Sequence, residues 1–412
     1  MDLRDKHLVL GLTGGIACYK AAELCRALIK QGATVQVVMT AAAERFITPV
    51  TMQALSNRTV YSSQWDTREA NNMPHINLGR AADAILIAPC SADFMVRLVH
   101  GSADELLSLL CLARPAARVP LLLAPAMNRE MWQHPATQRN MAQLQQDGAL
   151  LLGVGNGDQA CGETGDGRML EPAEIVEDVV AFFQPKALAG KHVVVTAGPT
   201  YEAMDPVRGI TNLSSGKMGF AIARAAREAG ARVTLVAGPV GLATPRGVTR
   251  MDVRSARVMY GATLDQVKTA DIFIATAAVA DWRPAEAAVH KIKKDGSGSA
   301  PALRFTENPD ILTAVAQSER ARNGALFCVG FAAESQDLLA NAQAKRLRKN
   351  VPLLVGNIGP ATFGQDDNAL LLVTADGVQE LGRAPKLELA RKLVATCAVL
   401  ARATAHDAGA IA

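Results

Sequence analysis

The sequence predicts an α/β protein built from two doubly wound domains. Short apolar runs alternate with longer amphipathic runs along most of the 412 residues, a pattern typical of parallel strands buried between helices. The segment Gln184–Gly190 interrupts this pattern with Pro, Lys and Gly, as a linker does, and KHVVVTAGPT then begins a second series. We therefore expect one domain at residues 1–187 and another at residues 188–412.

The first half contains five candidate strands separated by helical patterns. Two long amphipathic runs, Ile16–Gln31 and Asn128–Asp147, are expected to form helices between strands. Apolar runs of strand length predict the strands themselves. These are His7–Leu12, Thr34–Met39, Ala84–Ala88, Val119–Ala124 and Leu150–Gly153.

The second half repeats this layout without repeating its sequence. Its candidate strands are Val193–Ala197, Val233–Ala237, Asp271–Thr276, Leu326–Val329 and Leu353–Gly356. In sheets of this kind, ligands bind beyond the carboxyl ends of the strands. In both halves, the glycine-rich turns and the polar candidate residues described below follow those strand ends.

Composition narrows the class of protein. The chain has 43 basic and 39 acidic residues, a net charge of +4, which is too mild to indicate nucleic-acid binding and is compatible with anionic small substrates. Its seven cysteines include no CxxC pair, so we expect free thiols in a reducing compartment. No apolar run reaches the roughly 18 residues of a membrane span. We therefore expect a cytoplasmic protein with no membrane or nucleic-acid partner.

The turn after the first strand is rich in glycine and could approach a phosphate. Thr13, Gly14, Gly15 and Ile16 stand between strand and helix, where backbone N–H groups and the helix dipole favour an anion. The turn matches neither GxGxxG nor the Walker pattern, and a tight strand-to-helix turn without a ligand explains the same glycines. At later strand ends, Thr40 and Ser91 offer hydroxyls suited to phosphate or ribityl oxygens.

Three further residues of the first half are candidates for chemistry. Asn128 opens a predicted helix after APAM, where it could be an N-cap or a ligand. His75 is a lone histidine, which is more often structural than catalytic. Cys161 lies in a stretch with five glycines from Gly153 to Gly165, which we expect to be an irregular mobile lid. A thiol on a lid is a candidate proton donor or nucleophile.

The second half combines a helix start with several lysines. Ser214, Ser215 and Gly216 precede a helix and could bind an anion, but Met218 after Lys217 excludes a P-loop. A loop with Lys291, Lys293 and Lys294 could neutralise phosphates, although lysines on loops are usually just solvated. Lys345 and Lys349 lie four residues apart on one helical face.

These motifs carry a resemblance over roughly residues 6–400. TGGIA, Thr40, APCSAD, PAMN and ACGETGDGRM occur in this order in the flavin-containing cysteine decarboxylases. SSGKMG, AAVAD, KIKK, ENPDI, VGFAAE and KRLRKN resemble the phosphopantothenate–cysteine ligases. The chain as a whole resembles the bacterial bifunctional phosphopantothenoylcysteine decarboxylase / phosphopantothenate–cysteine ligase family of coenzyme A biosynthesis.

For the first domain the resemblance implies an FMN-dependent decarboxylase. FMN would contact Thr13, Gly14, Gly15, Ile16, Thr40, Ser91 and Ala92. His75 would orient or deprotonate the substrate, Asn128 would hold its carboxylate, and Cys161 would supply the last proton. The family usually has an Asn-Asp pair where this chain has Asp104–Glu105, a change of charge that bears on the flavin site.

For the second domain the resemblance implies a ligase that joins 4′-phosphopantothenate to L-cysteine through an acyl-cytidylate, with CTP as co-substrate. Mg²⁺ would bridge the phosphates, without an identified protein ligand, and Asn212 would assist the second half-reaction. The family also implies trimeric decarboxylase and dimeric ligase contacts, hence a larger homo-oligomer such as a dodecamer. The expected nucleotide-binding residues are Ala275, Thr276, Ala277, Asp281, Lys291, Asn308, Pro309, Asp310, Ile311, Phe331, Lys345 and Lys349.

The residues also argue against two other classes of protein. A flavin reductase with a dinucleotide domain would need GxGxxG and an acidic residue about 20 positions later, and the second half has neither. A regulatory flavin-binding protein of the same fold would need neither Cys161 on its glycine-rich segment nor His75. Both readings rank below the bifunctional enzyme.

Overall fold

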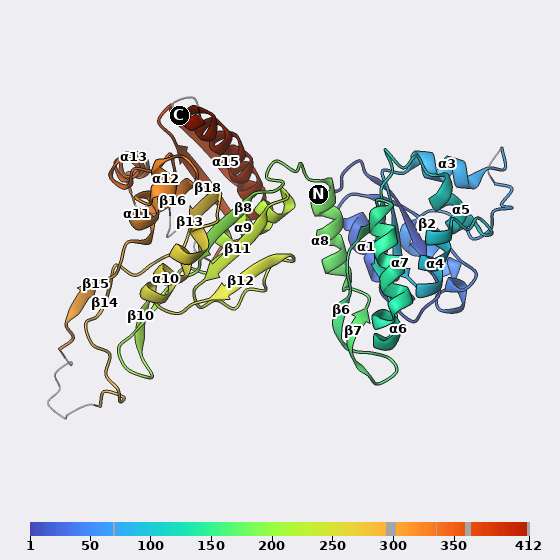
Figure 1. Cartoon of the computed structure of the whole chain (residues 1–412), viewed down its shortest axis with the longest axis horizontal. Coiled ribbons are helices and arrows are strands. Elements are labelled where there is room, and N and C mark those ends of the chain that lie inside the picture. Colours follow the sequence, from blue (N-terminus) through green and yellow to red (C-terminus); the bar gives the residue numbers. More distant parts are fainter. Residues whose placement is uncertain (69–70, 294–301, 335, 359–363, 410–412) are drawn as a thin grey trace. The chain divides into compact units, whose positions relative to one another are not determined.

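In a computed structural model, the chain forms two compact units, Met1–Phe183 and Gln184–Ala412 (Figure 1). The structure describes residues 1–68, 71–293, 302–334, 336–358 and 364–409. Lys294, one of the three lysines of the predicted phosphate loop, lies outside the described residues. None of the helices in these ranges combines the length and apolar character that crossing a bilayer requires.

The first unit is built on a five-stranded parallel sheet in the order β2-β1-β3-β4-β5. The order reverses between β1 and β3, and such a switch point opens a crevice at the carboxyl ends of the strands. The predicted parallel sheet is confirmed. The strands are β1 (His7–Leu12), β2 (Thr34–Met39), β3 (Ala84–Cys90), β4 (Leu121–Pro125) and β5 (Leu150–Leu151).

Helices cover both faces of this sheet, because alternate strand residues are buried on opposite sides. Leu8, Leu10 and Leu12 pack with α1 (Cys18–Lys30) and α8 (Pro172–Phe183). The intervening Val9 and the β3 residues Ile85 and Ile87 pack on the other face. That face is covered by α3 (Pro74–Ala81), α4 (Ala92–His100), α5 (Leu106–Ala113) and α7 (Pro135–Gln146), while α2 (Pro49–Ser56) lies beside β2 and α1.

The expectation of one helix over Asn128–Asp147 is wrong. The segment forms a short α6 (Arg129–Gln133) and then α7, which begins at Pro135. The ring of Pro135 disfavours helical backbone at the preceding residue, and His134 has φ −59° and ψ 133°. The break gives Asn128 a helix of its own to cap.

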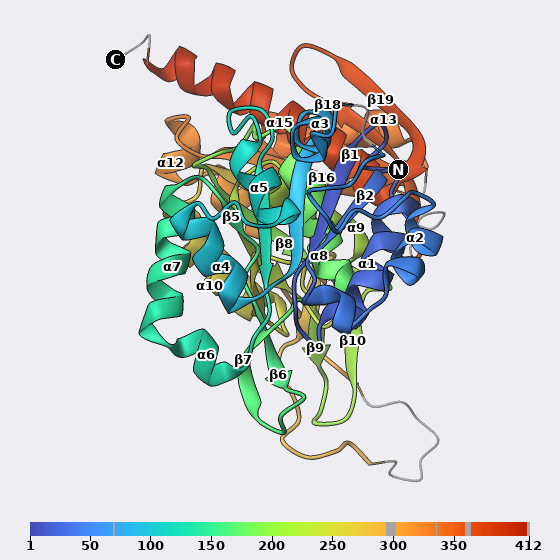
Figure 2. The ribbon, with the colours of Figure 1, turned by 90° about the vertical axis from the view of Figure 1, so that its right-hand side faces the viewer.

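The expectation that the glycine-rich stretch around Cys161 has no regular structure is also wrong. Strands β6 (Gly155–Asp158) and β7 (Thr164–Arg168) form an antiparallel hairpin next to α6 (Figure 2). Gly167 has φ +125°, and a Cβ atom there would lie 2.6 Å from the carbonyl oxygen of Met127. Glycine is therefore needed because the hairpin backbone packs directly on the chain at residues 127–129.

The second unit contains an eight-stranded sheet in the order β12-β11-β8-β13-β16-β17-β18-β19. Its first six strands are parallel, five of them as predicted and β12 in addition, and the order reverses between β8 and β13. Two antiparallel strands that the sequence did not predict, β18 (Asp367–Val373) and β19 (Val378–Pro385), complete one edge. The parallel strands are β8 (His192–Ala197), β11 (Arg232–Ala237), β12 (Val248–Asp252), β13 (Ile272–Ala275), β16 (Phe327–Glu334) and β17 (Leu353–Ile358).

This sheet is also covered on both faces. Val193, Val195 and Ile274 pack with α9 (Lys217–Glu228) and α15 (Lys386–Gly409). Val194 and Phe273 face the opposite layer of α10 (Ala256–Val267), α11 (Ile311–Ala316) and α13 (Leu338–Lys349), and α12 (Glu319–Arg322) follows α11.

Two hairpins lie outside the main sheet of the second unit. One consists of β9 (Tyr201–Ala203) and β10 (Gly209–Thr211), and the other of β14 (Trp282–Pro284) and β15 (Phe305–Glu307). The β14–β15 ribbon extends well beyond the body of its unit (Figure 1). We call the segment Ala285–Lys293, which leaves β14, the arm.

Candidate functional site

A cavity of about 870 Å³ opens at the carboxyl ends of β1, β3 and β4 in the first unit. Its position is the one that the strand order predicts, beside the switch point between β1 and β3. The structure brings together in its lining nine of the residues expected from the sequence: Thr13, Gly14, Gly15, Ile16, Thr40, Ser91, Ala92, Asn128 and Cys161.

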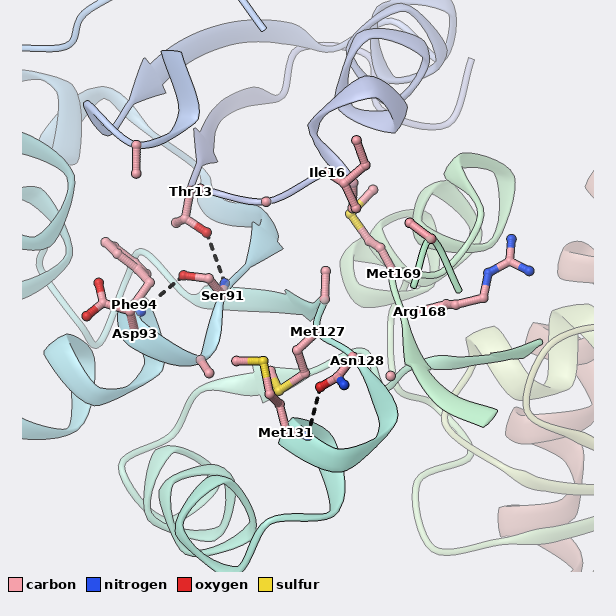
Figure 3. Close-up of a pocket in the computed structure, with 18 of the residues that line it drawn as sticks. Thr13, Ile16, Ser91, Asp93, Phe94, Met127, Asn128, Met131, Arg168 and Met169 are labelled. Carbon is pink, nitrogen blue, oxygen red and sulfur yellow. Dashed lines mark hydrogen bonds between the residues drawn. The ribbon is translucent and has the colours of Figure 1, made fainter. Parts of the chain in front are cut away.

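Hydrogen bonds fix the two strand-end turns of the cavity to each other. The Thr13 hydroxyl donates to the carbonyl oxygen of Pro89 at 2.7 Å and accepts from the Ser91 N–H at 2.9 Å. The Ser91 hydroxyl caps α4 by accepting from the Phe94 N–H at 3.2 Å (Figure 3). These hydroxyls therefore brace the wall of the cavity.

The start of α1 offers an anion site in the same wall. No side chain caps this helix at Ala17, and the N–H groups of its first three residues donate to the carbonyl oxygens of Gly15, Ile16 and Ala17. An anion would therefore meet the backbone of the turn at residues 14–17, just before the helix. A Cβ atom on Gly14 would lie 2.7 Å from the Cβ atom of Ala42, whereas one on Gly15 would meet nothing within 4 Å. Gly14 thus lets the turn pack closely, and Gly15 leaves the backbone open.

The cavity also has an apolar lining that is rich in sulfur. Ile16 and Met131 are exposed large apolar side chains, and Met127 and Met169 line the same space. In Figure 3 the Met169 side chain lies beside Ile16, while Met127 and Met131 lie together below. Polarisable thioethers next to an open apolar space suit a flat aromatic ligand.

Asn128 and Cys161 meet at the tip of the β6–β7 hairpin. Asn128 Oδ1 accepts from the Met131 N–H at 3.0 Å and so caps α6, while Nδ2 lies 3.4 Å from Glu163 Oε2. The thiol of Cys161 lies 3.7 Å from the same carboxylate oxygen. Gln159 Oε1 accepts from the Arg129 N–H at 2.9 Å, which holds the hairpin against α6. An amide donor, a carboxylate and an exposed thiol are thereby gathered at one mouth of the cavity.

His75 is not among the residues that line this cavity. It lies in the first turn of α3, and its Nδ1 atom is buried without a hydrogen-bond partner in the described part of the chain. The structure of one chain therefore does not bring His75 together with Asn128 and Cys161.

Charged residues that sequence reasoning missed also line the cavity, and Arg97 is the main one. Its guanidinium contacts Asp93 at 2.9 Å and Asp104 at 2.8 Å. These hydrogen bonds raise the pKa of Arg97 and lower the pKa of Asp104. Glu105 faces the cavity, and burial raises the pKa of its carboxyl group. The extra negative charge at Asp104 is thus paired with Arg97. The four-residue spacing of Asp93 and Arg97 was the sequence signal for the other ion pair of Arg97.

Lys20 is a second missed residue of the cavity wall. It is buried, and its ammonium donates to the carbonyl oxygen of Met169 at 3.0 Å and to Glu171 at 2.6 Å. Lys20 thereby ties α1 to the segment after β7.

In the second unit the strand-end residues Ala275, Thr276 and Ala277 lie beside the start of α9. The Thr276 hydroxyl donates to the carbonyl oxygen of Thr196, and the Ala277 N–H donates to Thr196 Oγ1 at 3.4 Å. A Cβ atom on Gly219 would lie 2.4 Å from Thr276 Oγ1. The SSGKMG segment therefore packs against the end of β13, at the switch point of this sheet.

Asn212 and the Asn308–Ile311 turn flank the same strand end. Asn212 Nδ2 donates to the carbonyl oxygen of Ala278 at 2.8 Å. The Asn308 N–H donates to the carbonyl oxygen of Asp281 at 2.8 Å, and Asn308 Nδ2 donates to that of Ala280 at 2.8 Å. These contacts place Asn212, Asp281 and the 308–311 turn along one edge of the sheet.

The two predicted helix lysines reach this edge from α13. Lys349 pairs with Asp310, whose carboxylate also caps α11 by accepting from the Thr313 N–H at 2.9 Å. The Lys345 ammonium donates to the carbonyl oxygen of Phe331 at 2.9 Å, and burial lowers its pKa. Pro309 and Ile311 flank Asp310 in the same turn.

Lys291 is placed differently from the other nucleotide candidates. It is exposed on the arm, as is Lys293. The neighbouring Ile292 is tied through its backbone to Asp205 and Arg208 in the β9–β10 turn. Sequence reasoning missed both of these residues. Within the described ranges no group of three or more His, Cys, Asp or Glu side chains is arranged to hold a metal ion.

Comparison with known proteins agrees with this division into two units. The family model described as "Flavoprotein" matches residues 1–184, and the one described as "DNA/pantothenate metabolism flavoprotein C-terminal domain" matches residues 188–400. The Coenzyme A biosynthesis bifunctional protein CoaBC of Vibrio cholerae is 49% identical over 94% of this chain and 97% of its own length. The proteins of that name from Escherichia coli K12 and Bacillus subtilis are 46% and 40% identical, over 92% and 98% of this chain and 93% and 99% of theirs. The resemblance seen in the motifs is confirmed: the chain belongs to the CoaBC family of bifunctional coenzyme A biosynthesis proteins.

Proposed function

We propose that this chain joins 4′-phosphopantothenate to L-cysteine at the expense of CTP and then decarboxylates the product to 4′-phosphopantetheine with FMN. Membership of a family named for two activities in coenzyme A biosynthesis supports both reactions. The observation that carries the proposal is the cavity that gathers Asn128, Cys161 and the uncapped start of α1 around an apolar space. The two steps follow in sequence, because the ligase product is the decarboxylase substrate.

The residues of the cavity fit FMN. The open backbone at Gly15, in the turn just before α1, suits its phosphate, and Ile16, Met127, Met131 and Met169 suit the flat faces of its ring. When bound, FMN would supply the two-electron oxidation of the substrate thiol that lets carbon dioxide leave, and the reduction that follows.

Asn128 and Cys161 would act on the substrate from the hairpin side. Asn128 Nδ2 already faces a carboxylate oxygen of Glu163 at 3.4 Å, which supports a role in holding the carboxylate of the substrate. Cys161 is exposed beside it and would donate the last proton. His75 would complete the site from a neighbouring subunit of a trimer, which accounts for its buried Nδ1 atom without a partner in the described part of one chain.

The edge of the second sheet would activate the other carboxylate. The 308–311 turn, Asp281, Phe331, Lys345 and Lys349 would bind CTP, with Mg²⁺ held by its phosphates rather than by the protein. Lys291 would neutralise charge that develops on the departing pyrophosphate. Asn212 would hold the acyl-cytidylate while the cysteine amine attacks. We propose dimeric contacts between ligase units, and a cytoplasmic homo-oligomer as the working form.

The test is one reaction on the purified full chain. The protein is mixed with 4′-phosphopantothenate, L-cysteine, CTP and Mg²⁺, and pyrophosphate, carbon dioxide and 4′-phosphopantetheine are measured together with bound flavin. We expect all three products, and much slower turnover when ATP replaces CTP. Pyrophosphate without carbon dioxide would contradict the decarboxylase assignment alone. Bound flavin with no product would favour the regulatory flavin-binding reading, and NADPH oxidation would favour the reductase.

A further inference from the structure

Asp205 is a fully buried carboxylate in the turn between β9 and β10. Its Oδ1 accepts from the N–H groups of Val207 at 2.8 Å and Arg208 at 2.7 Å. Its Oδ2 accepts from the Arg208 guanidinium at 2.7 and 3.0 Å. The side chain of Asp205 has no exposed surface, whereas that of Arg208 is 46% exposed. The buried Asp205 carboxylate is therefore the fixed member of this ion pair, and Arg208 is the member that reaches the surface.

This ion pair holds the arm through both backbone groups of one residue. The Ile292 N–H donates to Asp205 Oδ2 at 3.1 Å, and the carbonyl oxygen of Ile292 accepts from Arg208 Nη2 at 2.6 Å. Four residues earlier, the Ala288 N–H donates to the carbonyl oxygen of Met204 at 2.9 Å. The stretch 288–292 is thus fixed at two points to the turn 204–208.

We propose that Asp205 is a positioning residue that places Lys291 for the activation of the carboxylate by the nucleotide. This proposal rests on the proposed ligase function and adds a residue to it. Lys291 directly precedes the clamped Ile292, so the placement of its Cα atom follows from that clamp although its own side chain is exposed. The clamp also leads directly into β10 and then Asn212. The turn 204–208 thereby sets the position of Lys291, which is expected to act in the first half-reaction, and that of Asn212, which is expected to act in the second.

The electrostatics support a permanent clamp rather than a switch. Burial alone would raise the pKa of Asp205, but the hydrogen bonds from the Arg208 guanidinium and from the Val207, Arg208 and Ile292 N–H groups outweigh it and lower the pKa. Because the pKa lies below its ordinary value, the carboxylate stays ionised at every pH at which the enzyme would work. The charged side chain against the Asp205 carboxylate is the cationic Arg208, and the remaining partners are backbone N–H groups of Val207, Arg208 and Ile292.

The chain offers a matched control for this pair. Asp265 and Lys268 form a second aspartate–cation pair three residues apart, with N···O 2.7 Å, at the C-terminal end of α10. Both of those side chains are about 70% exposed, and neither bonds to the arm. Asp265→Asn therefore removes one negative charge from an ion pair of the same three-residue spacing and leaves the contacts between Asp205, Arg208 and Ile292 intact.

The experiment measures CTP-dependent pyrophosphate formation by the full chain in a double-mutant cycle. We expect Asp205→Asn to lower kcat about 10- to 100-fold with little change in the KM for CTP, since a misplaced group loses transition-state contact first. In a Lys291→Gln background the same change should have less than about a twofold effect, because the residue it positions is gone. Asp265→Asn should change neither constant, and decarboxylation of supplied phosphopantothenoylcysteine should continue in all variants.

Backbone hydrogen exchange supplies a readout that does not depend on activity. Asp205→Asn should speed exchange at the amides of residues 288–292 and leave those of β8 and β13 protected. If Asp205→Asn prevents the second unit from folding, Arg208→Lys takes its place, since it keeps the charge but loses the guanidinium that reaches the carbonyl of Ile292. Additive effects of Asp205→Asn and Lys291→Gln would overturn the positioning role while leaving that of Lys291 intact. An unchanged rate for Lys291→Gln alone would instead overturn the role proposed for Lys291, and the positioning role with it.

Discussion

The two units place their candidate residues in different ways. In the first unit the residues line one cavity, and Thr13, Ser91 and Asn128 each have hydrogen bonds that fix the turns from which they face it. In the second unit the residues lie along the edge of a sheet, and Lys291 stands on an exposed arm. The cavity is therefore organised by its own walls, whereas at the sheet edge the placement of Lys291 depends on contacts of the arm with the β9–β10 turn. Mutations should separate the two cases.

The largest effect is expected at the thiol of the first unit. Cys161→Ser should lower the rate of 4′-phosphopantetheine formation by about 10²- to 10⁴-fold, the usual contribution of a positioned proton donor. Carbon dioxide should still appear, because the proton is needed only after it leaves. The measurement is carbon dioxide against 4′-phosphopantetheine in a single turnover, and equal full-rate yields of both would count against this role.

A smaller but substantial loss is expected at the arm of the second unit. Lys291→Gln should lower CTP-dependent pyrophosphate formation by about 10²-fold, through loss of one cation at the developing charge. Decarboxylation of supplied phosphopantothenoylcysteine should be unchanged, since that reaction belongs to the other unit. A parallel loss in both assays would show that the units are not independent.

Asn212→Asp should slow the second half-reaction. The amide of Asn212 donates to the carbonyl oxygen of Ala278 at 2.8 Å, and a carboxylate in its place would be repelled by that oxygen. We expect acyl-cytidylate to accumulate on the enzyme when cysteine is present, at about a tenfold lower ligation rate. Rapid quenching with labelled 4′-phosphopantothenate would reveal it, and recovery of only free substrates would contradict the assignment.

Gly167→Ala should weaken the wall of the cavity. The new Cβ atom would lie 2.6 Å from the Met127 carbonyl oxygen at a φ of +125°, which costs about 1–3 kcal/mol of stability. Gly162→Ala is the control, since it has φ +85° but no atom within 4 Å of its Cβ position. Flavin retention and thermal unfolding should be impaired more by the first change than by the second. Equal behaviour would mean that the hairpin does not need to pack on residues 127–129.

The smallest effect is expected at the departure from the family pattern. Asp104→Asn removes an exposed ion pair to Arg97, and exposed pairs contribute little because water and salt screen them. Arg97 keeps its contact with Asp93, so flavin content and thermal stability should stay within experimental error. A clear loss of flavin would show that Asp104, and not Asp93, sets the position of Arg97.

The sequence predicted the elements whose signals are local, and failed where tertiary packing decides. Apolar runs found the parallel strands of both sheets except β12, and the motifs found nine of the residues that line the cavity. The β6–β7 hairpin was missed because its many glycines predicted irregular structure, although Gly167 is required by its close approach to Met127. Asp205 was missed because a single aspartate in a turn carries no motif. Its role depends on Ile292, 87 residues away.

The distribution of the cysteines has a practical consequence for chemical labelling. Six of the seven are buried, and burial raises the pKa of Cys18 and Cys25 to about 11 and that of Cys111, Cys328 and Cys397 to about 12. Cys90 is shifted upward in the same way. Cys161 alone is exposed, so an electrophilic dye should attach at one equivalent per chain. The folded protein thus carries a single covalent reporter position at the mouth of its cavity, and occupancy of that cavity can be followed as protection of one thiol.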